Sequence, residues 1–530
     1  MFKNLQIKLV LCCLGLCMVS TVGFASADNN SYNITSFGAV GDGKTMNTIA
    51  IQKAIDDCTT NGGGKVVFPQ GKFLSGTLEL KDNVTLHFQE GSELLGSTDL
   101  KDYRNVDPFT EGLGIKVGWA LLVAVDAKNI ALEGNGSING QGSELKEKHI
   151  RTDKRPEGER WGLRPFLLRV VRCEGVMVQD VNLYYAGAWT SHYFQSKKIH
   201  IENVKIVSHG VAHNDGIGID GCQDVTIRNC DIDSGDDALV FKTTSSKMSC
   251  SNINVSGMRL KSRQAGIKMG TESMANFENI TIRDCYIYDT RNGGIKLLTV
   301  DGANLQNVLI DGVKMDNVRT PMLFRLGSRL SVFRKHEDTK QSTGSMKNVT
   351  VRNVTAIAAA DAQLKPASGI LITGVPDHYI TGLTLENIEI HLAGGGTASD
   401  AREKVPEAVD QYPEVKTFGP KIPAYGVWAR HVKGLKLNNI KFLLQQNDLR
   451  PVLVCEDGLG IEVENWDIPE TSGAESIIRL EDVKKAIITR NRISGKADVF
   501  VKVEGKSKKI KTDQNHSQTV TELKMPLVMK

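Results

Sequence analysis

The chain has 530 residues, of which 65 are Lys or Arg and 61 are Asp or Glu, so that its formal charge is only +4. Such a balance argues against a protein organised around nucleic acid or an anionic membrane surface. With 40% apolar and 24% charged residues, the composition is that of an ordinary globular protein.

The first predicted element is a signal peptide over residues 1–27. Lys3 and Lys8 precede an apolar run at 9–24, and Ala25-Ser26-Ala27 has the small residues of a cleavage site. The run is short for a membrane span, although a retained anchor is the alternative. We therefore expect an exported protein, periplasmic or secreted, whose mature chain carries a charge of +2 after two Lys are lost.

The next predicted element is a helix over 46–59. Ile49, Ile51, Ala54 and Ile55 recur there at helical spacing. The repeat described in the next paragraph predicts a stack of strands with an open end, and the unpaired strand edges at such an end need a cover. We expect this helix to cap the N-terminal end of that stack.

From residue 84 onward one short pattern recurs: a turn residue, two apolar residues separated by one, then Asn or Asp and a further apolar residue. The copies lie at Val84, Ile130, Val176, Ile199, Val225, Ile253, Ile280, Val308, Val349, Leu383, Leu435, Ile461 and Ala486. Between Val176 and Val308 the steps are 23, 26, 28, 27 and 28 residues. Alternating β-branched units of this period are too small to fold alone, so they predict an all-β solenoid of stacked coils.

Three longer steps mark insertions. They span 46 residues before Val176, 41 before Val349 and 52 before Leu435. The first contains the basic run 146–160, and the last contains the Gly- and Pro-rich run 394–425. Insertions in solenoids gather on one face, often the binding face, although plain surface decoration is the alternative. The seven cysteines beyond the leader show no zinc spacing, so we expect no metal site; most should fill the core, with one or two disulfides left open.

Two acidic clusters carry the candidate chemistry. Asp215 and Asp236 are 21 residues apart, about one coil, and Asp237 adjoins Asp236. Neighbouring strands are about 4.8 Å apart, so the three carboxyl groups should meet, and one should retain its proton. An acid and a base in one cleft suit glycoside hydrolysis. Turn capping and calcium binding are the alternatives, but Lys242 stands where an EF-hand loop needs Glu.

Several longer motifs resemble one enzyme family. They are SFGAVGDGK at 36–44, GSINGQG at 136–142, RPFLL at 164–168, HNDGIGIDGC at 213–222 and SGDDALVFK at 234–242. Together they resemble glycoside hydrolase family 28, the polygalacturonase-like pectin hydrolases, from about residue 34 to 329. The resemblance implies a single-domain right-handed parallel β-helix, which we place at 28–505 as the catalytic domain, followed by a polar tail at 506–530. It implies no cofactor.

The resemblance also assigns roles. Asp236 would be the general acid, and Asp215 and Asp237 would activate water in an inverting hydrolysis. Such a pair ordinarily needs roughly 6.5–9.5 Å between carboxyl groups, which side chains splayed from adjacent coils should reach.

The sequence departs from the family where the substrate carboxylate is held. Ala265 stands at the position of the family's His, Lys296 at that of its Arg, and Leu298 at that of its Lys. The predicted substrate-binding residues are therefore Lys296, Lys268, His213, Lys242, Arg325 and Arg329, with turn or surface roles as the alternative for the two Arg. Trp189, His192 and Tyr425 either stack on a sugar or pack between coils.

These observations predict a divergent family member that hydrolyses a pectic, galacturonate-containing glycan. The expected partner is an acidic plant cell-wall polysaccharide or oligosaccharide, with exo-action on rhamnogalacturonan-type oligosaccharides as the specific candidate. We expect neither nucleic acid nor membrane as a partner. A β-helix polysaccharide lyase and a non-catalytic carbohydrate-binding solenoid are the alternatives.

Overall fold

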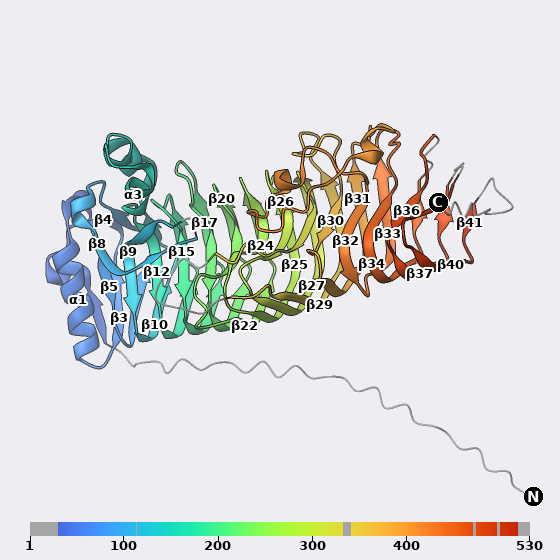
Figure 1. Ribbon diagram of the computed structural model, residues 1–530. Coiled ribbons are helices and arrows are strands. Elements are labelled where there is room, and N and C mark those ends of the chain that lie inside the picture. Colours follow the sequence, from blue (N-terminus) through green and yellow to red (C-terminus); the bar gives the residue numbers. More distant parts are fainter. Residues whose placement is uncertain (1–29, 113, 332–340, 470–472, 495–498, 518–530) are drawn as a thin grey trace, which may run out of the picture.

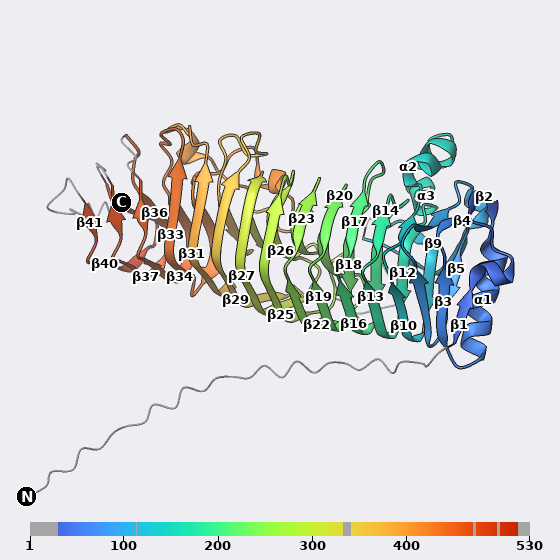
Figure 2. The ribbon, with the colours of Figure 1, turned by 180° about the vertical axis from the view of Figure 1, so that it is seen from behind.

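The computed structural model describes residues 30–112, 114–331, 341–469, 473–494 and 499–517, and in this part the chain winds into one long parallel β-helix (Figure 1). Each coil contributes a strand to each of three faces, which we call sheets A, B and C. Helix α1 (Thr48–Thr60) lies at one end and the last strands at the other, as the reverse view in Figure 2 also shows. The parallel β-helix is right-handed, as predicted.

The strands of each sheet run parallel and pair in order along the axis. Sheet A consists of β5 (Leu78–Leu80), β9 (Lys116–Val125), β12 (Phe166–Val171), β15 (Ser191–Phe194), β18 (Ile217–Asp220), β21 (Leu239–Thr243), β24 (Ala265–Ser273), β26 (Gly293–Thr299), β28 (Met322–Leu326), β30 (Ile370–Thr373), β32 (Val427–Lys433), β34 (Leu453–Glu464), β36 (Ile478–Glu481) and β39 (Val501–Glu504). Sheet B consists of β1 (Ser31–Asn33), β3 (Gly64–Phe68), β6 (Val84–Phe88), β10 (Lys128–Glu133), β13 (Glu174–Gln179), β16 (Lys197–Glu202), β19 (Gln223–Arg228), β22 (Cys250–Ser256), β25 (Phe277–Tyr288), β27 (Asn304–Val318), β29 (Ser345–Ala358), β31 (Ile380–Leu392), β33 (Lys436–Leu444), the second half of β34, β37 (Lys484–Thr489) and β40 (Lys508–Asp513). Sheet C consists of β2 (Asp42–Met46), β4 (Gly71–Ser75), β7 (Ser92–Gly96), β11 (Ser137–Asn139), β14 (Asn182–Tyr184), β17 (Lys205–Ser208), β20 (Asp231–Ser234), β23 (Arg259–Ser262), the second halves of the long sheet B strands, β35 (Asp467–Ile468), β38 (Arg492–Ile493) and β41 (His516–Ser517).

The predicted repeat is the register of sheet B. Val176 pairs with Ile199, Ile199 with Val225, and the series continues through Ile253, Ile280 and Val308 to Val349 and Leu383. All of these side chains are buried in the central core. Because each coil places the same kind of apolar side chain on the one below it, one continuous ladder fills the interior.

Asparagines of the repeat form the turns between strands. Asn279, Asn307 and Asn348 adopt left-handed backbone angles, with φ of 56°, 56° and 53°. The Asn307 side chain donates a hydrogen bond to Asn279 on the preceding coil at 3.2 Å. Asn tolerates this conformation better than most residues, which explains its recurrence at one turn.

The two ends of the stack differ. The predicted N-terminal helix is α1, whose buried Ile51, Ala54 and Ile55 join the central core. At the other end β40 pairs with β37 and β41 with β38, so the stack continues past the boundary that we expected at residue 505. Backbone pairing continues there although few apolar residues remain. The predicted signal peptide lies outside the described residues.

The insertions gather outside sheet A. The first forms α2 (Gly142–Leu145), a π-helical turn at Lys146–Ile150 and α3 (Glu157–Gly162). The segment 394–425 contains two short 3-10 helices, Asp400–Arg402 and Val415–Phe418; two more, Ile34–Phe37 and Leu100–Asp102, lie near the N-terminal end. β8 (Arg104–Thr110) pairs antiparallel with β9.

Two small apolar clusters fix these segments to the outer face of sheet A. One joins Leu323, Leu371 and Trp428 of sheet A to Val415 and Phe418 of the 394–425 segment. The other joins Phe109 of β8 to Phe166 of β12 and to Trp189. Between these two clusters lies a trough, whose lining includes Asp215, Asp236, Asp237 and Lys268.

Within the described residues, no helix is long and apolar enough to cross a bilayer. The seven described cysteines are all buried and unpaired, so the possible disulfides do not form.

Candidate active site

Asp215, Asp236 and Asp237 lie together in the trough, each in a turn that leads into sheet A. Asp215 precedes β18, and Asp236 and Asp237 precede β21. Because Ile217 pairs with Leu239, Asp215 and Asp237 occupy equivalent positions on adjacent coils. The predicted meeting of these carboxyl groups is therefore what the coil register produces.

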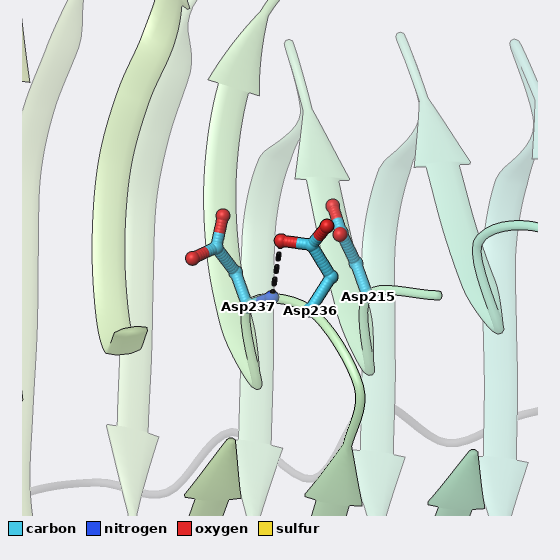
Figure 3. Close-up of side chains that lie close together, drawn as sticks. All are labelled: Asp215, Asp236 and Asp237. Atoms are coloured by element: carbon cyan, nitrogen blue, oxygen red, sulfur yellow. Dashed lines mark hydrogen bonds between the residues drawn. The ribbon is translucent and has the colours of Figure 1, made fainter. Parts of the chain in front are cut away.

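The three carboxyl groups are close together and point to the same side of the sheet, with Asp236 leaning toward Asp215 (Figure 3). One oxygen of each lies within 4.8 Å of the others. This limit joins one oxygen of each group, so the separation of roughly 6.5–9.5 Å between whole carboxyl groups in an inverting pair stays a prediction.

Burial and neighbouring charges shift the pKa values of the three carboxyl groups in different directions. Burial, together with Asp215 and Asp237, raises the pKa of Asp236 well above its ordinary value. Burial also raises the pKa of Asp215, against the opposing effect of Lys242. Burial would raise the pKa of Asp237 too, but Lys268, Lys242 and Lys296 together outweigh it and lower that pKa. These opposite shifts favour the protonated form of Asp236 and the ionised form of Asp237.

The lysines of the site come from the outward positions of sheet A. In β24 and β26 the side chains of Ile267, Met269, Ile295 and Leu297 belong to the core, whereas alternate residues point outward. Lys268 is one of these and pairs in register with Lys296. Two cations therefore stack on adjacent coils beside the carboxyl groups.

Each lysine is held by a carboxylate. The Nζ of Lys242 lies 3.1 Å from Asp215 and 3.7 Å from Glu272, and 4.1 Å from the centre of the Trp189 ring. The Nζ of Lys268 lies 2.8 Å from Asp237.

One wall of the trough comes from the N-terminal insertions. Glu111 from the β8–β9 turn, and Trp161 and Arg164 after the 146–160 run, line it. His213 packs its ring edge-on against Trp161 with centroids 5.1 Å apart, and its Nδ1 lies 3.2 Å from the guanidinium group of Arg164. Burial, Arg164 and Lys242 lower the pKa of His213 to about 4, so this predicted substrate-binding residue is neutral at pH 7.

The opposite wall comes from the 394–425 segment through Tyr412 and Glu414. Glu414 accepts hydrogen bonds from the Nζ of Lys296 at 2.8 Å and from the amide of Asn292 at 2.6 Å. Burial would raise the pKa of Glu414, but Lys296 and Lys268 lower it. Glu414 is therefore an ionised carboxylate that covers Lys296.

Two predicted arginines do not line the trough. Arg325 is buried and donates to Thr373 and Gly374 and to the carbonyl groups of Glu407 and Ala408. It therefore tethers the 394–425 segment to sheet A.

Arg329 bonds Asp301 at 2.9 Å and stacks over Tyr412, with its guanidinium carbon 5.5 Å from the ring centroid. It supports the trough wall from behind. Of the three aromatic candidates, Trp189 lines the trough, whereas His192 and Tyr425 are buried between coils.

The residues that the sequence did not single out are Glu111, Trp161, Arg164, Gln264, Asn292, Tyr412 and Glu414. Most come from the insertions, whose length and composition were the available signal. Gln264 and Asn292 occupy matching turns 28 residues apart and hydrogen-bond each other at 2.6 Å.

Comparison with known proteins gives the family. Residues 58–409 match the family model described as "Glycosyl hydrolases family 28". The chain belongs to this family. It is therefore a glycoside hydrolase, as predicted.

Curated relatives of this family 28 chain include a probable polygalacturonase of Vitis vinifera, 24% identical over 69% of the chain and 75% of the relative. An exopolygalacturonase of Zea mays is 25% identical over 70% of the chain and 86% of the relative. An exo-poly-alpha-D-galacturonosidase of Dickeya chrysanthemi is 28% identical over 39% of the chain and 41% of the relative.

Solved structures share the fold. The family 28 exopolygalacturonase of Yersinia enterocolitica has a TM-score of 0.63 at 18% identity, covering 82% of this chain and 79% of that one. The hyperthermoactive exopolygalacturonase of Thermotoga maritima has a TM-score of 0.57 at 20% identity, covering 78% of this chain and 92% of that one. The predicted family and fold are confirmed.

Proposed function

We propose that this family 28 member hydrolyses a pectic, galacturonate-containing glycan with inversion, and that Asp236, Asp215 and Asp237 carry the reaction. The observation that carries the proposal is that three carboxyl groups meet, with one oxygen of each within 4.8 Å of the others, while the pKa of Asp236 is raised and that of Asp237 is lowered. An acid and a base within one strand spacing provide both proton transfers of glycoside hydrolysis.

In this mechanism Asp236 donates its proton to the glycosidic oxygen as the bond from that oxygen to the anomeric carbon breaks. A water molecule attacks the anomeric carbon and gives its proton to Asp237, with Asp215 helping to orient it. Lys268 keeps Asp237 ionised, and Lys242 compensates the charge near Asp215. The proposal of inversion rests on the resemblance of the three aspartates to the family motifs.

The substrate is proposed from two sources. The names of the relatives support a pectic substrate, and several of those names specify exo-action. Ala265 and Leu298 stand where the family resemblance implies cationic groups, which favours a linkage other than that of plain homogalacturonan. We therefore propose exo-acting hydrolysis of rhamnogalacturonan-type oligosaccharides by an exported enzyme.

The test is release of reducing ends from a panel of pectic oligosaccharides. Wild-type protein should release them, and Asp236→Asn should lose at least about 100-fold of the rate, within the usual contribution of a general acid. Asp231→Asn is the matched control, because Asp231 lies at the start of the preceding strand β20 with a half-exposed side chain. Equal rates for wild type and Asp236→Asn would refute the assignment.

Two further measurements on the same reaction distinguish an inverting hydrolase from a lyase and from a non-catalytic binding protein. Early product observed by NMR should have the inverted anomeric configuration; a retained configuration would contradict the mechanism. A lyase would instead release unsaturated uronides that absorb in the ultraviolet, and a chelator should abolish that activity. A carbohydrate-binding solenoid would release no product from any oligosaccharide of the panel.

A further inference from the structure

The charges of the trough do not suit a uronate along its whole length. Six carboxyl groups and three cationic groups line it in the part of the chain that the structure describes. The carboxyl groups are those of Glu111, Asp215, Asp236, Asp237, Glu272 and Glu414, and the cations are Arg164, Lys242 and Lys268. An anionic sugar would find more acidic than basic groups there.

The cations near the reacting carboxyl groups already have partners. Lys242 lies against Asp215 and Glu272, and Lys268 against Asp237. Arg164 donates to the carbonyl groups of Ala212 and Trp161. Lys296, at a family position for binding the substrate carboxylate, is covered by Glu414 at 2.8 Å.

The Glu414 side of the trough offers hydrogen-bond acceptors. The Oε2 of Glu414 accepts hydrogen bonds from both Lys296 and Asn292. The Oδ1 of Asn292 is buried without a hydrogen-bond partner among the described residues. The orientation of the Asn292 amide follows from its hydrogen bonds, because Nδ2 donates to both Gln264 and Glu414. Glu414 lines the trough, where its other oxygen would accept a hydrogen bond from a sugar hydroxyl, whereas a sugar carboxylate would face it with like charge.

We propose that the sugar bound against Glu414 is neutral, and that Glu414 determines specificity by excluding a uronate from this position. The inference rests on the proposed hydrolase function and names the residue that selects the neutral sugar of its substrate. A uronate at this place would have to displace Glu414 from Lys296 and leave one buried carboxylate without its cation.

The experiment compares kcat/KM on two α-linked oligosaccharides of equal length, one of uronate alone and one in which uronate alternates with a neutral sugar. Wild type should prefer the alternating oligosaccharide at least tenfold. Glu414→Gln frees Lys296 and should reduce this preference at least tenfold, with a gain on the uronate oligosaccharide. Glu403→Gln, an exposed position of the same segment, should keep the wild-type preference.

A wild-type preference for the all-uronate oligosaccharide would overturn the inference, as would an unchanged preference in Glu414→Gln with a wild-type melting temperature. If Glu414→Gln does not fold, the wild-type comparison still decides. If wild type cleaves neither oligosaccharide, the proposed function fails separately. Calorimetric titration of Asp236→Asn with each oligosaccharide then decides the inference alone: tighter binding of the alternating one supports it, and tighter binding of the uronate contradicts it.

Discussion

Replacement of Lys268 by Met tests how the site keeps one carboxylate ionised. Lys268 is buried and its Nζ lies 2.8 Å from Asp237. At this distance, with an effective dielectric constant of about 20, the Coulomb attraction is about 6 kcal/mol before the cost of desolvation. Opposite charges this close ordinarily shift a carboxyl pKa by about 1–3 units. Without Lys268, burial and the neighbouring carboxyl groups should raise the pKa of Asp237 by about that amount.

The measurement is kcat/KM as a function of pH on the pectic oligosaccharide that wild type cleaves best. In the proposed mechanism activity requires ionised Asp237, so kcat/KM should fall as the pH drops through the pKa of that group. In Lys268→Met this acidic limb should move to higher pH by about 1–3 units. Lys261→Met is the control, because Lys261 bonds Asp233 at 3.2 Å on the outside of the preceding strand. An acidic limb that stays in place or moves to lower pH would refute the reasoning.

Three further predictions concern stability and the trough wall. Asp236→Asn should raise the free energy of unfolding at pH 7 by about 0.5–2 kcal/mol, because wild type loses stability as the pH rises from the ordinary carboxyl pKa of 3.8 in the unfolded chain toward the raised native pKa of Asp236. Urea unfolding should show that this gain vanishes below pH 3.8, where the carboxyl is protonated in both states. Ile280→Ala should cost about 2–5 kcal/mol in the same assay, whereas Thr281→Ala, whose side chain points outward, should cost far less; equal losses would contradict the ladder. Arg325→Met should weaken attachment of the 394–425 segment by about 1–3 kcal/mol, seen as faster limited proteolysis near Ala408. An unchanged cleavage pattern would show that the tether is dispensable.

The fold and the three carboxyl groups could be predicted because both depend on local repetition. A step of 23–28 residues between equivalent apolar positions determines which side chains stack, and Asp215 and Asp237 follow from the same register. The walls of the trough could not be predicted this way. Glu414 reaches Lys296 from 118 residues further along the chain, in a segment without a repeat.

Charge alone also misled the assignment of two arginines. Arg325 lies in β28 of sheet A and Arg329 follows that strand, and both have the side chain that binds carboxylates best. In the structure they bond carbonyl groups of the chain and Asp301 instead. Whether an outward-pointing arginine meets substrate or protein depends on the segment that folds over it, and no local pattern encodes that path.

The attachment of the 394–425 segment separates two properties that many enzymes combine. The carboxyl groups proposed to react belong to the coils, whereas Tyr412 and Glu414 belong to a segment that enters several coils later and rests on Leu323 and Leu371. Such a segment can be exchanged between homologues without disturbing the register that builds the acid and base. Substrate preference can thus diverge during evolution while the chemistry is inherited unchanged, and a chimera with another family member's segment is a direct route to new selectivity.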